Sequence, residues 1–394
     1  MPKFLKNLRH TNKFILLVSI ALFLFGLVMV FSASNISAVM RYGESPYYYA
    51  IRQGLFLIVG LIGFFFIINI DTKNYGKYAW LGVLGCIGLL LFAYLYGPVI
   101  NDSKGWINLG IINIQPGELV KVIEIVWIAT FFELKKLALN QPGPSIFMFF
   151  MIAVMAGLVV IANDYGTAII ILAIAGIMYL LVPIRPKVKY GLVLAAIVVI
   201  LIVVPFYALF NTAKLQRQLG RFQNFGNPCS EEKFYNEGNQ VCNSIIAFNN
   251  GGVFGKGLGN STQKYLYLPD CHTDFIFAIV VEETGLFGGT IVILAFMTLI
   301  FLVIRVGVRA KTFHGSMICY GTAIYIFLHI AVNIGGISGA IPLTGVPLPF
   351  ISYGGTFTIC LVGALSMVQR VEIETRTSTT ETKTVKPVPK KEKK

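Results

Sequence analysis

Residues 14–32 read FILLVSIALFLFGLVMVFS, a run without a single charged side chain. A helix needs about 20 mainly apolar residues to cross the hydrocarbon core of a bilayer. The run follows a basic leader (Lys3, Lys6, Arg9 and Lys13), as the core of a signal peptide would. Nine further apolar runs come after it, so we predict that it is an uncleaved first membrane helix.

The rest of the chain has the same apolar character. Hydrophobic residues make up 56% of the 394 residues and charged residues only 13%, which is more apolar surface than a soluble core can bury. We therefore predict an all-α integral membrane protein of about ten transmembrane helices. After the first, the runs are Ile51–Ile70, Ala79–Leu95, Leu119–Phe132, Ile146–Ala162, Ala168–Val182, Tyr190–Phe210, Asp274–Ile304, Met317–Ile341 and Phe350–Val368.

Basic residues indicate which helix ends face the cytoplasm, because cytoplasmic loops carry an excess of Lys and Arg. With the N-terminus inside, the outer connections hold few basic residues, such as Arg41 and Lys104. An even number of helices then returns the C-terminus to the cytoplasm, so we predict a multi-pass protein of the cytoplasmic membrane. The predicted inner loops hold Lys73, Lys77, Lys135, Lys136, Arg185, Lys187, Lys189, Arg305, Arg309 and Lys311.

Three regions are predicted along the chain. Residues 1–13 form a cytoplasmic N-terminus, residues 14–370 form one polytopic membrane domain, and residues 371–394 form a disordered basic cytoplasmic tail. The net charge of +14 would suit a nucleic-acid-binding protein, but the charge is collected in short loops and in this tail, so no nucleic-acid partner is expected. The tail fits contact with anionic lipid, and docking of a cytoplasmic partner is the alternative.

The longest outer segment, residues 211–273, is a large extracellular loop between predicted helices 7 and 8. A connection of this length usually has a function of its own. It contains Cys229 and Cys242, which would form a disulfide if the loop faces an oxidising compartment. Cys271 would then be the unpaired thiol.

A glycine-rich stretch at residues 249–259 resembles a nucleotide-binding loop. The match fails, because Asn250 stands where a P-loop needs Gly and Gly257 stands where it needs Ser or Thr. Two interpretations remain open. The backbone N–H groups could hold an anion such as a pyrophosphate, or the stretch could be a flexible loop.

Charged residues inside or at the ends of apolar runs are costly and therefore point to function. Glu118, Lys121 and Glu124 follow Pro116 at spacings that share one helical stripe. The alternative is a carboxylate paired with a lysine that extends towards water. Asp164 lies in a tight turn, where a helix-capping role is the alternative to a functional one.

Asp274 is the strongest candidate. It begins an apolar run, so its carboxylate is expected at the border between water and lipid. Partial burial would raise the pKa of this carboxyl towards the range of a general base. A metal ligand and a helix N-cap are the alternatives. Residues 333–355, with six glycines and three prolines, break one span and restart another, so they fit a wall of the site or an ordinary outer turn.

These segments together resemble the SEDS (shape, elongation, division and sporulation) family of membrane glycosyltransferases. The resemblance covers most of residues 100–370. It rests on Trp106-Ile107, Gln115-Pro116-x-Glu118-Leu119-x-Lys121, Asp164-x-Gly166-Thr167, residues 264–283 and residues 339–355.

The resemblance implies a fold and an activity. It implies ten helices with both ends cytoplasmic, and polymerisation of lipid II at the outer face of the membrane with release of undecaprenyl pyrophosphate. Asp274 is implied as the essential acidic residue, which activates the 4-hydroxyl of the acceptor sugar, directly or through a divalent cation (Mg or Mn), with no organic cofactor. The implied substrate contacts are Lys104, Trp106, Glu118, Lys121, Asp164, Lys264, His272, Thr273, Asn333 and Ser352.

Residues 263–269 resemble the division branch more than the elongation branch, and the sporulation branch is close. The implied partners are a class B penicillin-binding protein and other divisome proteins, at the division septum. The chain departs from the family at Gly117, Asn163, His329 and Thr356-Phe357. A lipid II flippase and a non-catalytic scaffold for the transpeptidase are the competing functions.

Overall fold

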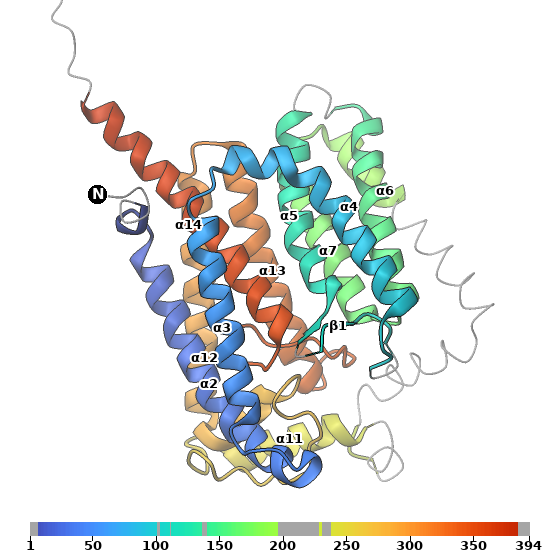
Figure 1. Cartoon of the computed structure of the whole chain (residues 1–394), viewed down its shortest axis with the longest axis vertical. Helices are drawn as coiled ribbons and strands as arrows, with labels where there is room; N and C mark the ends of the chain where they lie inside the picture. The colour runs from blue at the N-terminus through green and yellow to red at the C-terminus, as the bar shows by residue number, and fades with distance from the viewer. Residues whose placement is uncertain are drawn as a thin grey trace, which may run out of the picture.

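The computed structural model describes residues 7–100, 103–110, 112–135, 140–195, 228–230 and 238–384, with side chains up to residue 377. Its elements are nearly all helical, as the apolar runs predict (Figure 1). The helices are α2 (Lys13–Tyr42), α3 (Tyr48–Ile67), α4 (Thr72–Tyr96), α5 (Pro116–Leu134), α6 (Pro142–Ile161), α7 (Tyr165–Leu181), α11 (Asn239–Gly251), α12 (Ile276–Arg309), α13 (Phe313–Ile337) and α14 (Gly355–Thr384), and the strands are β1 (Ile107–Asn108) and β2 (Asn113–Ile114).

Seven of the described helices are long and apolar enough to cross a bilayer, namely α2, α3, α4, α6, α12, α13 and α14 up to residue 377. The coarse prediction of a helical multi-pass membrane protein is therefore confirmed. Helix α7 is also apolar but has only 17 residues. Helix α5 carries Glu118, Lys121, Glu124 and Glu133, and with these charged residues it is not among the seven candidate spans. The predicted seventh helix, Tyr190–Phe210, lies outside the described residues from 196 onward. Residues 211–227 and 231–237 of the predicted loop at 211–273 also lie outside them.

Local sequence explains where these helices begin and end. The side chain of Asn12 accepts hydrogen bonds from the backbone N–H groups of Phe14 and Ile15, which caps α2. The same helix ends at Gly43, whose φ of 65° is a left-handed conformation that glycine adopts without strain. Proline occupies the first turn of α5 and of α6, where the missing N–H costs nothing.

Helix α13 lies between two groups of helices (Figure 1). It packs against α12 and α14 on one side and against α5 and α7 on the other. Close approach to the second group depends on Gly321, because a Cβ there would lie 2.6 Å from Ile125 of α5 and 2.8 Å from Met178 of α7. The core of the molecule is formed where these helices meet.

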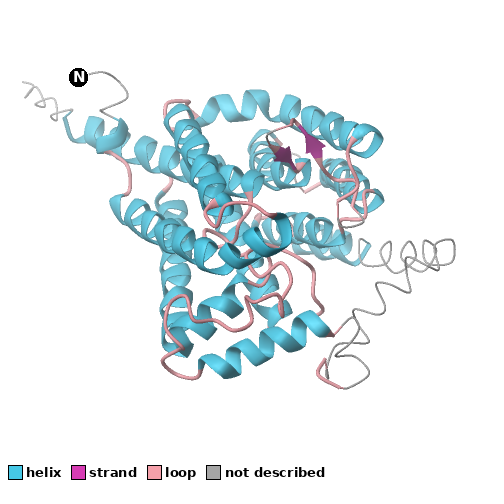
Figure 2. Cartoon of the chain, turned by 60° about the horizontal axis from the view of Figure 1, so that its bottom comes forward, coloured by secondary structure: helices cyan, strands magenta, loops and turns pink. Residues whose placement is uncertain are grey.

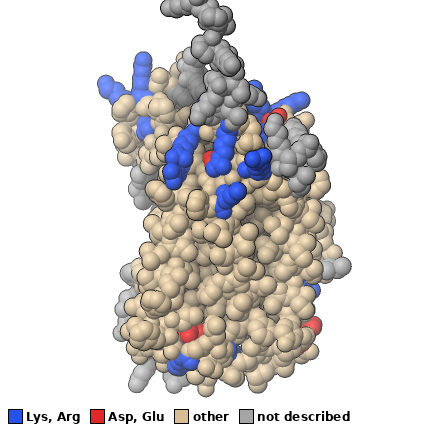
Figure 3. Space-filling view, turned by 90° about the vertical axis from the view of Figure 1, so that its left-hand side faces the viewer, with Lys and Arg blue, Asp and Glu red and all other residues tan. Residues whose placement is uncertain are grey.

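The two ends of the bundle differ in structure and charge. One end, here the loop end, carries the β1–β2 hairpin, α11 and the segments 252–275 and 338–354 (Figure 1). Figure 2 turns this end towards the viewer and shows its strands and loops. The opposite end, here the basic end, carries the start of α2 and the far end of α14, and Lys and Arg side chains gather there (Figure 3). The charge asymmetry predicted from the loops is therefore present in the fold.

Candidate functional site

Asp274 lies at the loop end, in the turn just before α12. The helix begins at Ile276, two residues later than the apolar run suggested, and its N-cap residue is Phe275 without a side-chain capping bond. The N-cap interpretation of Asp274 is therefore wrong. Its side chain is partly buried and accepts no hydrogen bond from the described residues. A carboxylate left unpaired in this way is available to a ligand.

The backbone around Asp274 is held by α13 and by the segment 346–353. Asn333 donates from Nδ2 to the carbonyl oxygen of Asp274 at 2.7 Å. The hydroxyl of Ser352 donates to the carbonyl oxygen of Thr273 at 2.6 Å, and the N–H of Tyr353 donates to that of His272 at 2.9 Å. Asn333 and Ser352, both predicted as substrate contacts, thus bond to the main chain of residues 273–274.

Gly345 forms the surface that faces the Asp274 side chain. Its φ is 69°, and a Cβ added there would lie 3.2 Å from Oδ2 of Asp274. A larger residue would be strained and would crowd the carboxylate. The glycine- and proline-rich segment therefore lies along the site as a wall, as one of its two interpretations predicted.

Burial and neighbouring charges act on the ionisation of this site. Burial first, and then the negative charges of Asp270 and Asp164, raise the pKa of Asp274 to about 7. Burial lowers the pKa of His272 to about 4, so its imidazole is neutral at physiological pH. The His272 ring lies 4.3 Å from the ring of Tyr49. Of the two groups, Asp274 therefore titrates near neutral pH and His272 does not.

Asp164 joins this site from α7. Its Oδ1 accepts from the N–H of Thr167 at 3.1 Å, which confirms the capping interpretation. Its Oδ2 accepts from Nε2 of Gln115 at 2.8 Å, at the start of α5. The structure therefore brings two of the three acidic positions, Asp164 and Asp274, close enough for their charges to interact.

The third acidic position forms a buried cluster between α5 and α13. Nζ of Lys121 lies 2.7 Å from Oε1 of Glu118 and 3.0 Å from Nε2 of His329. Nδ1 of His329 lies 3.1 Å from the carbonyl oxygen of Pro347, which links the cluster to the wall of the site. Lys121 is only 1% exposed, so the pairing is confirmed but the extension towards water is wrong. Both carboxylate oxygens of Glu124 are buried without a hydrogen-bond partner among the described residues.

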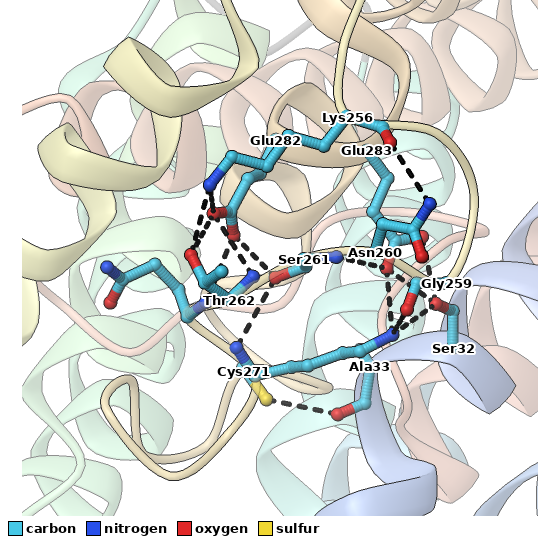
Figure 4. Close-up of polar contacts among 12 residues, drawn as sticks. Ser32, Ala33, Lys256, Gly259, Asn260, Ser261, Thr262, Cys271, Glu282 and Glu283 are labelled. Atoms are coloured by element: carbon cyan, nitrogen blue, oxygen red, sulfur yellow. Dashed lines mark hydrogen bonds and ion pairs between the residues drawn. The ribbon is translucent and has the colours of Figure 1, made fainter.

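Lys264, another predicted substrate contact, is buried in an ion pair (Figure 4). Its Nζ lies 3.1 Å from Oε1 of Glu283, and it also donates to the carbonyl oxygen of Gly259 and to the hydroxyl of Ser32. Glu282 accepts from Ser261, Thr262 and Lys256. The two glutamates of α12 thus hold the segment 256–264.

The glycine-rich stretch is paired with α12 through its backbone. The N–H groups of Lys256 and Gly257 donate to the carbonyl oxygens of Glu282 and Glu283, each at 3.0 Å, and that of Gly255 donates to Gly251. An anion cradle at these three amides is therefore excluded. The partner helix is interrupted at Gly285, a break that the sequence reasoning missed.

The remaining predicted residues lie around this centre. Lys104 and Trp106 belong to the connection between α4 and α5, and no hydrogen bond or ion pair of the described part of the chain joins their side chains to Asp274. Thr273 donates from its hydroxyl to the carbonyl oxygen of Asp270 at 2.9 Å. A cavity of about 290 Å³, lined by Arg41, Asp270 and His272 among others, opens between the end of α2 and residues 264–272.

The three cysteines of the loop have the arrangement predicted for a loop in an oxidising compartment, with one disulfide and one unpaired thiol. Cys229 and Cys242 form a disulfide at the start of α11. Cys271 is a buried free thiol that donates to the carbonyl oxygen of Ala33, and burial raises its pKa to about 12. A thiol with that pKa is protonated and inert at neutral pH.

Comparisons with known proteins agree with the motifs. Residues 12–377 match the model of the FtsW, RodA and SpoVE cell cycle proteins. The chain is 35% identical to the probable peptidoglycan glycosyltransferase FtsW of Bacillus subtilis, over 94% of this chain and 92% of that protein. It is 34% identical to stage V sporulation protein E of the same organism, over 92% and 98%.

Two solved structures share the fold. A chain of a peptidoglycan synthase complex, described for its structural coordination of polymerization and crosslinking, superposes with a TM-score of 0.71 at 19% identity, over 93% of this chain and 98% of that one. RodA of Thermus thermophilus gives a TM-score of 0.64 at 19% identity, over 92% and 96%. The resemblance to SEDS proteins is confirmed, and the chain belongs to the FtsW, RodA and SpoVE family of cell cycle proteins.

Proposed function

We propose that this chain is a peptidoglycan glycosyltransferase that polymerises lipid II into glycan strands at the outer face of the cytoplasmic membrane. Relatives that match nearly its whole length are named as probable peptidoglycan glycosyltransferases. The observation that carries the proposal is the Asp274 carboxylate, which is free of hydrogen bonds from the described residues, lies at the loop end and has a pKa of about 7. A general base works best when its pKa is near the operating pH.

In the proposed reaction Asp274 accepts the proton of the acceptor sugar's 4-hydroxyl. The freed oxygen attacks the anomeric carbon of the donor chain, a new C1–O4 bond forms, and the bond from C1 to undecaprenyl pyrophosphate breaks. Attack opposite the leaving group inverts the α-linked donor into a β-linked product. The bonds from Asn333, Ser352 and Tyr353 to the backbone of residues 272–274 hold the base in place, and such orientation lowers the barrier.

A divalent cation, Mg or Mn, is part of the proposal. Among the described residues no three His, Cys, Asp or Glu side chains are arranged to hold a metal ion by themselves. Mg²⁺ commonly binds one or two protein carboxylates together with phosphate oxygens of the substrate, which suits Asp274 as a single protein ligand. Such a cation would neutralise charge on the pyrophosphate leaving group.

The proposed setting is the division septum, with a class B penicillin-binding protein as partner and other divisome proteins alongside. Matches to proteins named FtsW support the division role, and a fold shared with a chain of a peptidoglycan synthase complex supports the partner. We further propose ten membrane helices, with Tyr190–Phe210 as the seventh, and both termini cytoplasmic. The gathering of Lys and Arg at one end supports that orientation (Figure 3).

A lipid II flippase is the second candidate. The buried cluster of Glu118, Lys121 and His329 favours it, because charged groups inside a helix bundle often mark a translocation path. The position of Asp274 at the loop end favours the polymerase, because substrate sites of transporters lie near the bilayer midplane.

One experiment separates these functions. The purified protein and its penicillin-binding partner are given lipid II and Mg²⁺, and glycan strands are measured for the parent, for Asp274→Asn and for Glu44→Gln, an exposed carboxylate of the loop end. We expect strands from the parent and from Glu44→Gln, and none from Asp274→Asn. Polymerisation by Asp274→Asn at the parent rate would refute the mechanism. Lipid II transfer across liposomes without any strands would instead establish transport.

A further inference from the structure

A cavity of about 270 Å³ lies at the basic end, far from Asp274, where the start of α2 meets the end of α12 and the middle of α14. We name it the basic cavity. Its lining includes Lys13, Phe14, Arg305, Arg309, Glu372 and Arg376. The reaction proposed above uses none of these residues.

The charges around the basic cavity are mostly uncompensated. Glu372 is buried and is paired with Arg376, with N–O distances of 2.6 Å. Lys13, Arg305 and Arg309 are exposed and form no ion pair with any described residue. Cations that line one cavity repel one another, so an anion bound among them would be stabilised by all of them.

The depth of the basic cavity matches the headgroup layer of a membrane. Lys13 is the first residue of α2 and Arg309 is the last of α12, and both helices are candidate membrane spans. Phe14, which follows Lys13 into the span, is 69% exposed. The cavity therefore places cations at the end of two spans and an exposed apolar ring directly beside them.

The rim of the basic cavity is fixed before any ligand arrives. The N–H of Asn12 donates to Oε1 of Gln369 at 2.7 Å, and Nε2 of Gln369 donates back to the carbonyl oxygen of Asn12 at 3.2 Å. This pair ties the start of α2 to α14. A site that is already ordered loses less entropy when it binds.

We propose that the basic cavity binds the headgroup of an anionic phospholipid in the leaflet at the basic end. The phosphate would contact Arg305, Arg309 and Lys13, and an acyl chain would lie against Phe14. The proposal favours a lipid over an acidic peptide because the exposed apolar ring lies beside the cations within a membrane span.

The test is a binding titration of the full-length, delipidated protein in detergent. Native mass spectrometry measures the amount of each ligand bound. The probes are dioleoyl phosphatidylglycerol, dioleoyl phosphatidylcholine, inorganic phosphate and an acidic oligoglutamate peptide. The test variant is Arg305→Gln/Arg309→Gln. The control is Arg185→Gln/Lys187→Gln, which removes the same charge from exposed positions after α7.

We expect the parent and the control to bind phosphatidylglycerol more tightly than phosphatidylcholine. Removal of two interfacial cations should weaken phosphatidylglycerol binding about 30-fold, which corresponds to about 2 kcal/mol. Lys13→Gln should weaken phosphatidylglycerol binding about fivefold. This variant keeps both arginines, so it tests the proposal even if the double variant fails to fold.

Four results would overturn the proposal. Equal phosphatidylglycerol binding by the parent and the double variant would place the lipid elsewhere. Equal affinity for the two lipids would remove the role of charge. Inorganic phosphate that binds the parent as tightly as phosphatidylglycerol would mean a small-anion site, and an acidic peptide that binds while the lipid does not would mean a protein-docking site.

Discussion

Asn333 uses both hydrogens of its amide on backbone carbonyls, donating to Asp274 and to Val346 at 2.7 Å each. One side chain of α13 therefore fixes the turn that carries the carboxylate and the wall that faces it. The arrangement makes Asn333 a positioning residue, because its contacts are with main chain and not with the reacting atoms.

Replacement of Asn333 by Ala should leave both carbonyl groups without this donor and let Asp274 move. A displacement of about 1 Å can cost about a hundredfold in rate, so we expect kcat for lipid II polymerisation to fall by that order. Asn260→Ala, at an exposed position of the loop end, is the matched control. A loss confined to KM, with kcat unchanged, would show that Asn333 binds substrate instead.

The pH dependence of polymerisation should report Asp274. A base with a pKa of about 7 gains activity as pH rises through 7, because only the deprotonated carboxylate accepts a proton. The charge of Asp270 helps to raise this pKa, so Asp270→Asn should move the midpoint of kcat/KM to lower pH. Asparagine also tolerates the positive φ of 53° at that position. Glu44→Gln should leave the midpoint in place, and an unmoved midpoint in Asp270→Asn would contradict the assignment.

The same raised pKa predicts that Asp274 destabilises the folded protein at alkaline pH. Its ordinary pKa of 3.8 lies below the folded value of about 7, so the folded state holds this proton more tightly than the unfolded state does. The stability that this proton contributes is complete below pH 4 and is lost as pH rises through 7. Asp274→Asn should therefore melt higher than the parent at pH 8, by a margin that shrinks towards pH 5. Equal melting temperatures of the parent and Asp274→Asn at pH 8, measured in detergent, would contradict this prediction.

The sequence was sufficient for features that depend on neighbouring residues. Apolar runs located the seven candidate membrane helices of the described residues, because each span must satisfy its own backbone. The position of Asp274 just before α12 followed from where one run begins. The buried pair of Lys121 and His329 was not predictable, because it joins residues 208 positions apart. The break at Gly285 was not predictable either, because it depends on a contact with a segment distant in the sequence. A Cβ at Gly285 would collide with the backbone at Phe254.

The buried ion pair of Lys264 and Glu283 gives a prediction that separates structure from substrate binding. Both side chains are at most 1% exposed, and removal of one partner leaves a buried charge that typically costs about 3–5 kcal/mol. We expect Lys264→Met and Glu283→Gln to lower the melting temperature sharply, and the double variant Lys264→Met/Glu283→Gln to recover much of the loss. Lys256→Met is the control, because Lys256 pairs with Glu282 but its side chain is 31% exposed.

Polymerisation assays on the same four variants decide the role of Lys264. If its ammonium only neutralises Glu283, activity should return in the double variant together with stability, because the segment 256–264 regains its packing on α12. If Lys264 contacts lipid II, as the family resemblance implies, the double variant should fold well and stay inactive. Each single variant lowers the melting temperature relative to the parent. If the loss in the double variant equals the sum of the two single losses, the pair is not coupled.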